Sequence, residues 1–414
     1  MRGKNLIESL TLGVTGSSAS YKAAKLVSLL SPWAKVNVIL TPAAEKFVKK
    51  PLFWRPGVEC YTESDWWQSK FLHLELKNVD AFVIAPCTVN TAMKLTTGIA
   101  DNLLLATAVA FAGKIEKQEI YNPIYCALAA NPNMLEAPMV KKRLKLQDGV
   151  AIKFIDSLTG KLACGDVGRG RMIEPEELAP FLLMNVNVNF GNLKEIKNYR
   201  VIVSGGATKA YIDSVRFITN SASGELARLL ALAFAKAGFE TVLVTTSRPL
   251  GLVKSVLVDT AKEMLSVVKN EWLGARNSQK NVIYVSSAAI SDFTPKRYSK
   301  KIRKSEVEFP FKLELYPEVD VLKELFSIKG KKDFIVGFSL LDSIDSEALN
   351  VAKQKMRSKG MDLVVANIVS NMGAGEKKSY VAKLLFAENE LEFYGEKLEF
   401  APFLVNLLIS KLFC

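Results

Sequence analysis

The feature that most constrains this chain is a repeated change between short apolar runs, rich in β-branched residues, and longer stretches with helical periodicity. Such alternation is typical of βαβ units, in which helices join consecutive parallel strands. It therefore predicts an α/β protein with doubly wound, mainly parallel sheets. The predicted strands are Leu10–Val14, Val36–Leu40, Ala81–Ala85, Val201–Val203, Thr241–Thr246, Asn281–Val285 and Asp362–Ala366.

A turn-rich stretch divides this pattern into two halves. Between Pro180 and Arg200 the chain passes through Asn185, Asn187, Asn189, Gly191 and Asn192, and a new strand with a glycine-rich loop follows. We expect a domain with a flavodoxin-like or Rossmann-like parallel sheet over residues 1–190. A second, Rossmann-like domain is expected over residues 191–414, and each domain should bind its ligand at the carboxyl ends of its strands.

Cysteine usage and hydropathy predict a cytoplasmic protein. The five cysteines lack CxxC or Cys/His spacing, so neither a disulfide framework nor a zinc site is expected. The N-terminus has no apolar segment and the chain has no charge-free stretch of about 18 apolar residues, so we expect no membrane association. The net charge of +13 fits nucleic acid, an anionic membrane or small phosphorylated ligands, and composition does not choose among them.

In the first half, small and hydroxyl-bearing residues follow the predicted strands. Gly13–Lys22 is a small-residue turn that opens a helix, whose free N–H groups and positive dipole end suit a phosphate. By itself this turn is equally well explained as a tight turn capped by one of its serines. Strand ends of this kind also suit a planar cofactor with a ribityl chain. The candidate cofactor-binding residues are Gly16, Ser17, Ser18, Thr41, Thr88, Asn90 and Thr91.

Three further segments carry polar or reactive side chains. His73, the only histidine, lies in Leu72–Leu76, and without other information such a residue is more often part of a core. Asn131–Met134 has the composition of a turn, although its first asparagine can hydrogen-bond a carboxylate. Gly160–Met172 has glycines on both sides of Cys164, which would let a loop close over a substrate; a buried structural thiol is the alternative.

Together these segments resemble the flavin-containing cysteine decarboxylases, and more closely the decarboxylase half of the bifunctional phosphopantothenoylcysteine decarboxylase/phosphopantothenate-cysteine ligases. The resemblance implies FMN as cofactor, catalytic roles for His73, Asn131 and Cys164, and substrate contacts from Met134 and Ala163. In the implied chemistry the flavin oxidises the cysteine thiol of the substrate to a thioaldehyde, carbon dioxide is lost, and the reduced flavin returns the hydride equivalent. Cys164 would protonate the enethiolate, while His73 and Asn131 orient the substrate and handle protons.

The second half opens with another glycine-rich turn, Gly205–Lys209, followed by the hydroxyl-rich and amide-rich stretch Ile212–Gly224. The N–H and O–H donors of such a turn converge and suit phosphate oxygens. Ala288–Phe293 adds an aspartate, and Lys296–Lys304 holds six basic residues without an acid. A basic run of this kind is usually a solvated loop or a nucleic-acid patch.

These motifs resemble the ligase signature, so the resemblance runs from one end of the chain to the other. It implies activation of 4'-phosphopantothenate by CTP as an acyl-cytidylate, attack by the cysteine amine, and Mg²⁺ at Asp292. It also implies that Asn220 acts on the acyl-nucleotide and that Arg216 contacts substrate. Phe338 is a nucleotide contact by resemblance but a core residue by default. The implied nucleotide-binding residues are Ser286, Ser287, Ala288, Asp292, Lys301, Pro317, Glu318, Phe338, Lys355 and Lys359.

Some residues depart from the family pattern. They are Leu128, Ala130, Lys209, Ser214, Ala222 and Glu225. The alternative functions are a flavoenzyme of the same fold with other chemistry, a regulatory flavin-fold protein without catalysis, and a nucleic-acid-binding protein. The attached ligase motifs argue against the first alternative. The joint presence of His73, Asn131 and Cys164 argues against the second, and the lack of a nucleic-acid recognition motif argues against the third. By resemblance we expect small-molecule substrates and a homo-oligomer with trimeric contacts in the first half and dimeric contacts in the second, which together would build a dodecamer.

Overall fold

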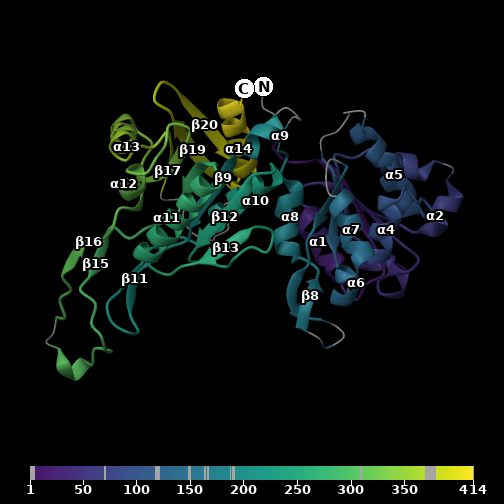
Figure 1. Ribbon diagram of the computed structural model, residues 1–414, viewed down its shortest axis with the longest axis horizontal. Coiled ribbons are helices and arrows are strands. Elements are labelled where there is room, and N and C mark those ends of the chain that lie inside the picture. Colours follow the sequence, from purple (N-terminus) through teal and green to yellow (C-terminus); the bar gives the residue numbers. More distant parts are fainter. Residues whose placement is uncertain are drawn as a thin grey trace. The chain divides into compact units, whose positions relative to one another are not determined.

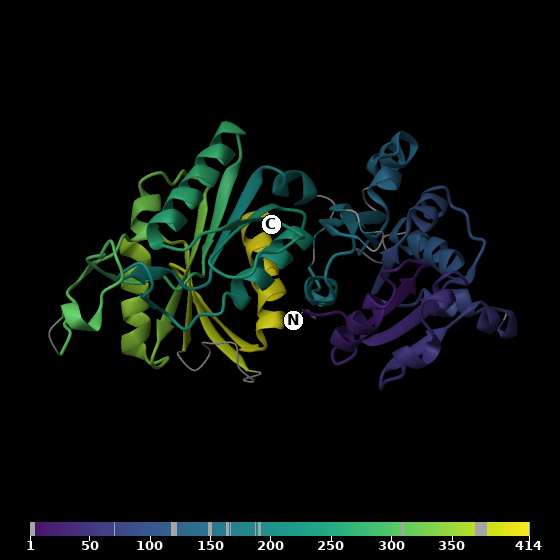
Figure 2. The ribbon, with the colours of Figure 1, turned by 90° about the horizontal axis from the view of Figure 1, so that it is seen from below.

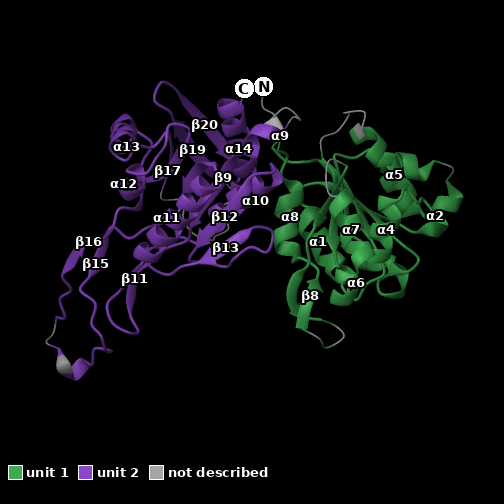
Figure 3. Cartoon of the chain, viewed as in Figure 1, with its two compact units in different colours: residues 1–187 green, residues 188–414 purple. Residues whose placement is uncertain are grey.

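The chain forms two compact units, residues 1–187 and residues 188–414 (Figure 3). Each unit is built on one large sheet with helices packed against it, as the ribbons in Figure 1 and Figure 2 show. The computed structural model describes residues 5–69, 71–116, 122–147, 151–162, 165, 167–186, 188, 192–307, 310–368 and 379–413.

The first unit contains a sheet of six parallel strands in the order β3-β2-β1-β4-β5-β6. In this doubly wound order the chain starts in the middle of the sheet, moves to one edge, and then returns to build the other side. The prediction of a parallel α/β sheet is confirmed. The strands are β1 (Ser9–Val14), β2 (Lys35–Leu40), β3 (Val58–Tyr61), β4 (Ala81–Cys87), β5 (Ile124–Leu128) and β6 (Ile152–Ile155).

Hydrophobic periodicity explains how the helices cover this sheet. α1 buries Ala23, Leu26, Val27 and Leu30, the i, i+3, i+4, i+7 pattern of one helical face. All seven residues of β4 are buried, as expected for a central parallel strand covered on both faces. The helices are α1 (Lys22–Leu30), α2 (Glu63–Gln68), α3 (Leu72–Leu76), α4 (Val89–Thr96), α5 (Leu103–Glu116), α6 (Pro132–Glu136), α7 (Pro138–Gln147) and α8 (Pro175–Leu183).

Two smaller features complete this unit. A capping box starts α2, because the Asp65 carboxylate accepts hydrogen bonds from the Thr62 N–H at 2.6 Å and the Thr62 hydroxyl at 2.7 Å. The Lys50 ammonium lies 2.6 Å from the same carboxylate. β7 (Leu158–Lys161) and β8 (Val167–Arg171) form an antiparallel pair outside the main sheet.

The second unit repeats the doubly wound order and extends it. Its sheet runs β13-β12-β9-β14-β17-β18-β19-β20, in which the first six strands are parallel. β19 and β20 are antiparallel and lie outside the predicted pattern. The strands are β9 (Tyr199–Gly205), β12 (Glu240–Thr245), β13 (Lys254–Leu257), β14 (Asn281–Ser286), β17 (Phe334–Leu341), β18 (Leu363–Ile368), β19 (Tyr380–Leu385) and β20 (Glu390–Gly395).

Helices pack on this second sheet through distinct apolar clusters. Met264, Val268 and Trp272 of α11 share one cluster with Ile202 and Tyr284 of the central strands. α10 packs against β9 and β12 and against α14, the yellow helix in Figure 2. The helices are α9 (Asn192–Ile196), α10 (Glu225–Lys236), α11 (Ala261–Asn277), α12 (Val321–Phe326), α13 (Ser346–Ser358) and α14 (Lys397–Phe413).

Two short antiparallel pairs leave the second sheet at the carboxyl ends of its central strands. β10 (Lys209–Tyr211) and β11 (Phe217–Thr219) follow β9, and β15 (Phe293–Pro295) pairs with β16 (Leu315–Pro317) after β14. In Figure 1 the β15–β16 pair is the stem of a long arm that extends from the sheet. The arm contains the basic stretch of residues 296–304.

Candidate functional site

The first candidate site lies where the chain reverses its direction of travel across the sheet, between β1 and β4. Thr15, which is 1% exposed, joins the loops that follow these strands. Its hydroxyl donates to the Pro86 carbonyl at 2.8 Å and accepts the Thr88 N–H at 3.1 Å. The carboxyl ends of the two central strands are therefore held together by one buried threonine.

Close packing makes glycine necessary in the loop after β1. A Cβ atom on Gly16 would lie 2.6 Å from the Cβ of Ala43, in the loop after β2. Thr41, at the end of β2, orders that second loop because its hydroxyl accepts the Ala44 N–H at 3.2 Å and donates to the Val14 carbonyl at 3.3 Å. The two loops thus approach closely enough to form one wall of a cavity.

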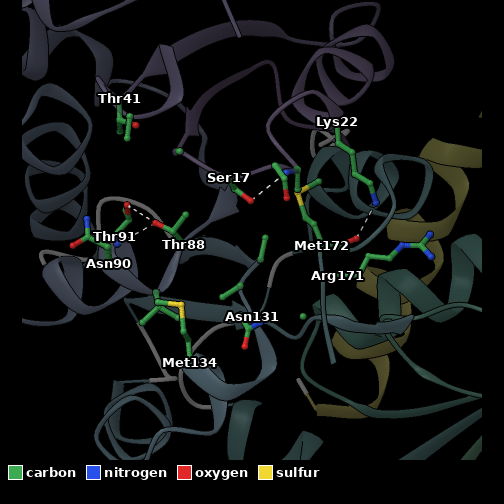
Figure 4. A pocket seen from close by; sticks show the side chains of 18 of the residues that line it. Ser17, Lys22, Thr41, Thr88, Asn90, Thr91, Asn131, Met134, Arg171 and Met172 are labelled. Carbon is green, nitrogen blue, oxygen red and sulfur yellow. Dashed lines mark hydrogen bonds between the residues drawn. The ribbon is translucent and has the colours of Figure 1, made fainter. Parts of the chain in front are cut away.

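A cavity of about 1250 Å³ opens at the carboxyl ends of β1, β2, β4 and β5 (Figure 4). All seven predicted cofactor-binding residues line it, together with Asn131 and Met134. The wall formed by the loops after β1, β2 and β4 carries small, hydroxyl and amide side chains. These residues fit a flavin, since hydroxyl and N–H donors suit its phosphate and ribityl chain, and small side chains leave room for its planar ring.

Asn131 begins α6 on the opposite side of the cavity. Its Oδ1 accepts the Asn133 N–H at 2.9 Å, which makes it the N-cap of that helix. The pair β7–β8 packs tightly against this segment, because a Cβ on Gly170 would lie 2.1 Å from the Ala130 carbonyl oxygen and a Cβ on Gly168 would lie 2.7 Å from Pro132. Close packing against Ala130 and Pro132 thus explains two glycines of the predicted substrate loop. Ala163 and Cys164 lie outside the described residues.

The sequence prediction missed a charged group at one end of the cavity. The Lys22 ammonium donates to the Glu174 carboxylate at 3.1 Å and to the Met172 carbonyl at 3.2 Å, and Arg171 also donates to Glu174. Burial alone would raise the pKa of Glu174, but the hydrogen bonds from Arg171 and Lys22 lower it below its ordinary value. Lys22 is the last residue of the motif Gly13–Lys22, and Arg171 is the last but one of Gly160–Met172. Their place in these motifs was the only sequence signal for them.

His73 lies in α3 and is not among the described residues that line this cavity. Its ring is held by Trp66, whose indole Nε1–H donates to His73 Nδ1 at 3.2 Å. The two rings meet edge to face with their centroids 5.7 Å apart, and Trp66 stacks in turn on Trp67. An indole N–H can only donate, so Nδ1 acts as the acceptor and the neutral imidazole carries its proton on Nε2.

The second candidate site lies at the equivalent position of the second sheet, between β9 and β14. Gly206 has φ +84°, in the left-handed region, and a Cβ on Gly205 would lie 2.1 Å from the Cβ of Ala227 in α10. The loop after β14 is tied to this turn, because Ser287 donates its N–H and its hydroxyl to the Ser204 carbonyl at 3.1 and 2.9 Å. The glycine turn and the loop after β14 therefore lie against each other.

Asn220 contacts these loops from the segment after β11. Its Nδ2 donates to the Ala289 carbonyl at 3.1 Å, and the Ala289 N–H donates to the Gly206 carbonyl at 2.8 Å. The structure therefore brings together three predicted elements: Asn220, the glycine turn, and the segment that contains Ser286, Ser287 and Ala288.

The predicted residues Asp292, Pro317 and Glu318 lie together at the stem of the arm. Phe293 pairs with Pro317, and the Glu318 N–H donates to the Asp292 carbonyl at 2.9 Å. Among the residues that the structure describes, no group of three or more His, Cys, Asp or Glu side chains could hold a metal ion. A metal at Asp292 stays a prediction.

The remaining predicted nucleotide contacts have mixed surroundings. Phe338 lies inside β17, one residue beyond Gly337, which pairs with Ser286, and its ring meets Phe400 at 6.5 Å. Lys301 and Lys355 are exposed. Lys359 pairs instead with Asp320, with 2.8 Å between the ammonium and the carboxylate.

Known families match both units of the chain. Residues 2–187 match the Flavoprotein family, and residues 196–411 match the family described as DNA/pantothenate metabolism flavoprotein C-terminal domain. The chain is 34% identical to the coenzyme A biosynthesis bifunctional protein CoaBC of Bacillus subtilis (strain 168), over 88% of this chain and 86% of that protein. The chain belongs to the CoaBC family.

Other relatives extend this similarity. The CoaBC protein of Haemophilus influenzae (strain ATCC 51907 / DSM 11121 / KW20 / Rd) is 30% identical over 99% of this chain and 98% of that protein. A solved structure of a mutant PPC decarboxylase complexed with pantothenoylaminoethenethiol is 31% identical and covers 42% of this chain and 94% of that chain, with a TM-score of 0.37. None of the helices in the described part of the chain combines the length and apolar character needed to cross a bilayer.

The Trp66–His73 contact can be tested on the single histidine of this CoaBC family member. Trp66→Phe keeps an aromatic ring but removes the N–H, so the Nδ1–H tautomer of His73 should gain population. Long-range proton–nitrogen NMR spectra of tag-free protein labelled in histidine, recorded at mildly alkaline pH, report the tautomer directly. Trp67→Phe is the matched control, since Trp67 is 78% exposed, and should leave the spectrum unchanged. An unchanged tautomer in Trp66→Phe would show that the indole does not control it.

The approach of Gly16 to Ala43 gives a second test, of flavin binding. Gly16→Ala should weaken flavin binding by roughly tenfold or more, because the added methyl group must push apart two loops of the cavity wall. Gly113→Ala, in α5 of the same unit, is the control, since nothing lies within 4 Å of its added Cβ. Flavin affinity is measured by fluorescence quenching on titration of the protein. Equal affinities for the two variants would place the flavin elsewhere.

Proposed function

We propose that this chain catalyses two consecutive steps of coenzyme A biosynthesis. Residues 191–414 would join 4'-phosphopantothenate to L-cysteine with CTP, through an acyl-cytidylate. Residues 1–190 would then decarboxylate 4'-phosphopantothenoylcysteine to 4'-phosphopantetheine with FMN. The observation that carries the proposal is that one chain matches both families. In the first half the expected residues line a cavity at the ends of the central strands, and in the second half Asn220 contacts the loop after β14.

In the ligase half, the geometry of Asn220 supports a role in stabilising charge. One N–H of its amide is used by the Ala289 carbonyl, which fixes the orientation of the side chain. The second N–H is then free to donate to the charge that develops on the acyl-nucleotide. Mg²⁺ binds proteins through one or two carboxylates together with substrate phosphates, so Asp292, beside Glu318, is a suitable contact for CTP-bound Mg²⁺.

In the decarboxylase half, the residues of the cavity would bind and orient. The loops after β1 and β4 offer hydroxyl and backbone donors to the FMN phosphate and ribityl chain, and bound FMN supplies the two-electron chemistry that leaves no net redox change. Asn131 can direct its amide N–H groups at the substrate carboxylate. Cys164 would donate the proton that replaces the lost carboxyl group.

The position of His73 supports an oligomeric decarboxylase. His73 is not in the lining of its own chain's cavity, and Trp67 and Phe71 beside it are 78% and 62% exposed. Large exposed apolar side chains mark interaction surfaces. We therefore propose that trimeric contacts of the first half carry His73 to the cavity of a neighbouring copy, and that ligase dimers complete a dodecamer. A monomer in light scattering would contradict this arrangement.

A single incubation tests both steps. The protein receives 4'-phosphopantothenate, cysteine, CTP and Mg²⁺, and pyrophosphate, the coupled amide and carbon dioxide are followed. Wild type should yield all three and 4'-phosphopantetheine. Asn220→Ala should slow pyrophosphate release by about 10²–10³-fold, the usual effect of removing one charge-stabilising donor. Cys164→Ser should release pyrophosphate at the wild-type rate, lose carbon dioxide and stop at the enethiolate, so that no 4'-phosphopantetheine forms.

The pattern of failure separates the alternatives. Pyrophosphate without carbon dioxide in wild type would restrict the activity to the second half. No turnover in either step would favour the regulatory flavin-fold protein considered above.

A further inference from the structure

The turn between β10 and β11 contains a buried carboxylate, that of Asp213, whose side chain is 0% exposed. Its Oδ1 accepts the N–H groups of Val215 and Arg216 at 2.8 and 2.7 Å, which closes the turn. Its Oδ2 faces a distant segment and accepts the Ile302 N–H at 3.1 Å. The backbone hydrogen bond from Arg216 is the main cause that lowers the pKa of Asp213 below its ordinary value, so the group is charged at neutral pH.

Arg216 also binds the backbone of Ile302. Its Nη2 donates to the Ile302 carbonyl at 2.9 Å, and its Nη1 lies 3.5 Å from Asp213 Oδ2. Both polar backbone groups of Ile302 are therefore held, one by the aspartate and one by the arginine. The sequence predicted Arg216 as a substrate contact, and the structure places its guanidinium on the basic segment.

Ile302 is an unusual member of this segment, which we define as residues 296–304. Its side chain is only 7% exposed, whereas every other residue of the basic segment is exposed. Two further contacts tie the segment to the same hairpin: the Tyr298 N–H donates to the Ile212 carbonyl at 2.8 Å, and the Arg297 guanidinium lies 5.0 Å from the centre of the Tyr211 ring.

The hairpin is itself anchored to the body of the unit. Lys209 pairs with Asp259 at 2.7 Å, and the Tyr211 hydroxyl donates to the same carboxylate. A run of like charges would otherwise be disordered and would pay the cost of ordering when a ligand binds. Here the contacts with the hairpin order the backbone before binding and leave the cationic side chains on the surface.

We propose that Asp213 is a positioning residue of the ligase half, which with Arg216 clamps the peptide groups of Ile302 and so holds Lys301 ready for the phosphates of CTP. This inference rests on the proposed function of residues 191–414. Asp213 does not touch the nucleotide in this scheme and acts through the segment that it holds. The burial of the Ile302 side chain explains why an apolar residue stands at position 302 within the basic run.

Asp213→Asn tests the clamp selectively. The amide oxygen of the asparagine can still accept the two N–H groups that close the turn. An NH₂ group, however, replaces Oδ2 and lies opposite the Ile302 N–H and the Arg216 guanidinium, so that hydrogen-bond donors face each other. We expect the KM for CTP to rise about tenfold and trypsin to cleave within residues 296–304 about tenfold faster. The decarboxylation of preformed 4'-phosphopantothenoylcysteine by the same chain should be unchanged.

A double-mutant cycle separates positioning from general support. Lys301→Ala should raise the KM for CTP without speeding cleavage at the other basic residues. If Asp213 acts through Lys301, adding Asp213→Asn to Lys301→Ala should raise the KM little further. Fully additive effects on KM would overturn the proposal, as would unchanged cleavage in Asp213→Asn.

Two controls keep the result interpretable. Ile302→Pro removes the N–H that Asp213 Oδ2 accepts but leaves Asp213 and its turn intact. It should reproduce the faster cleavage and the higher KM, so the test does not depend on the folding of one variant. A wild-type chain that releases no pyrophosphate from CTP would overturn the proposed function, and the role of the clamp with it. An active wild type with an unaffected Asp213→Asn variant would overturn the clamp alone.

Discussion

In a doubly wound sheet the connections after two neighbouring central strands leave toward opposite sides, so no loop fills the space between the ends of these strands. Both halves of this protein are organised around such a gap. In the first unit it lies between β1 and β4, and in the second between β9 and β14. The loops after these strands meet edge to edge and present backbone donors and small side chains to whatever binds there. Thr15 in one unit and Ser287 in the other join the paired loops by hydrogen bonds.

This constraint explains the glycine requirements and the different chemistry of the two sites. Gly16, Gly170 and Gly205 each lie where backbone approaches a neighbouring segment too closely for a Cβ atom. On this shared frame the loops after β1, β2 and β4 of the first unit carry mainly hydroxyl and amide groups, which suit a flavin. The second unit adds an arm with six basic residues, which contacts the hairpin that follows the glycine turn.

Much of the fold could be predicted from sequence, because buried parallel strands are continuous apolar runs. The predicted Asn281–Val285 and the observed β14 differ by one residue. β20 was not predicted, since its burial is mostly low and its charged residues hide the pattern. Motifs also located most of the cavity lining. Contacts between residues distant in sequence could not be predicted. No local sequence pattern indicates that Lys359 pairs with Asp320, or that Arg216 donates a hydrogen bond to the Ile302 carbonyl.

A crystal structure of the chain grown with FMN, CTP and Mg²⁺ would test the central claim most directly, that each unit holds one ligand at the gap between its central strands. The flavin should lie against Gly16 and Thr88, with the cytidine nucleotide beside Ser287 and Ala288. Electron density for both ligands in a single unit, or for the flavin away from the ends of β1 and β4, would contradict it.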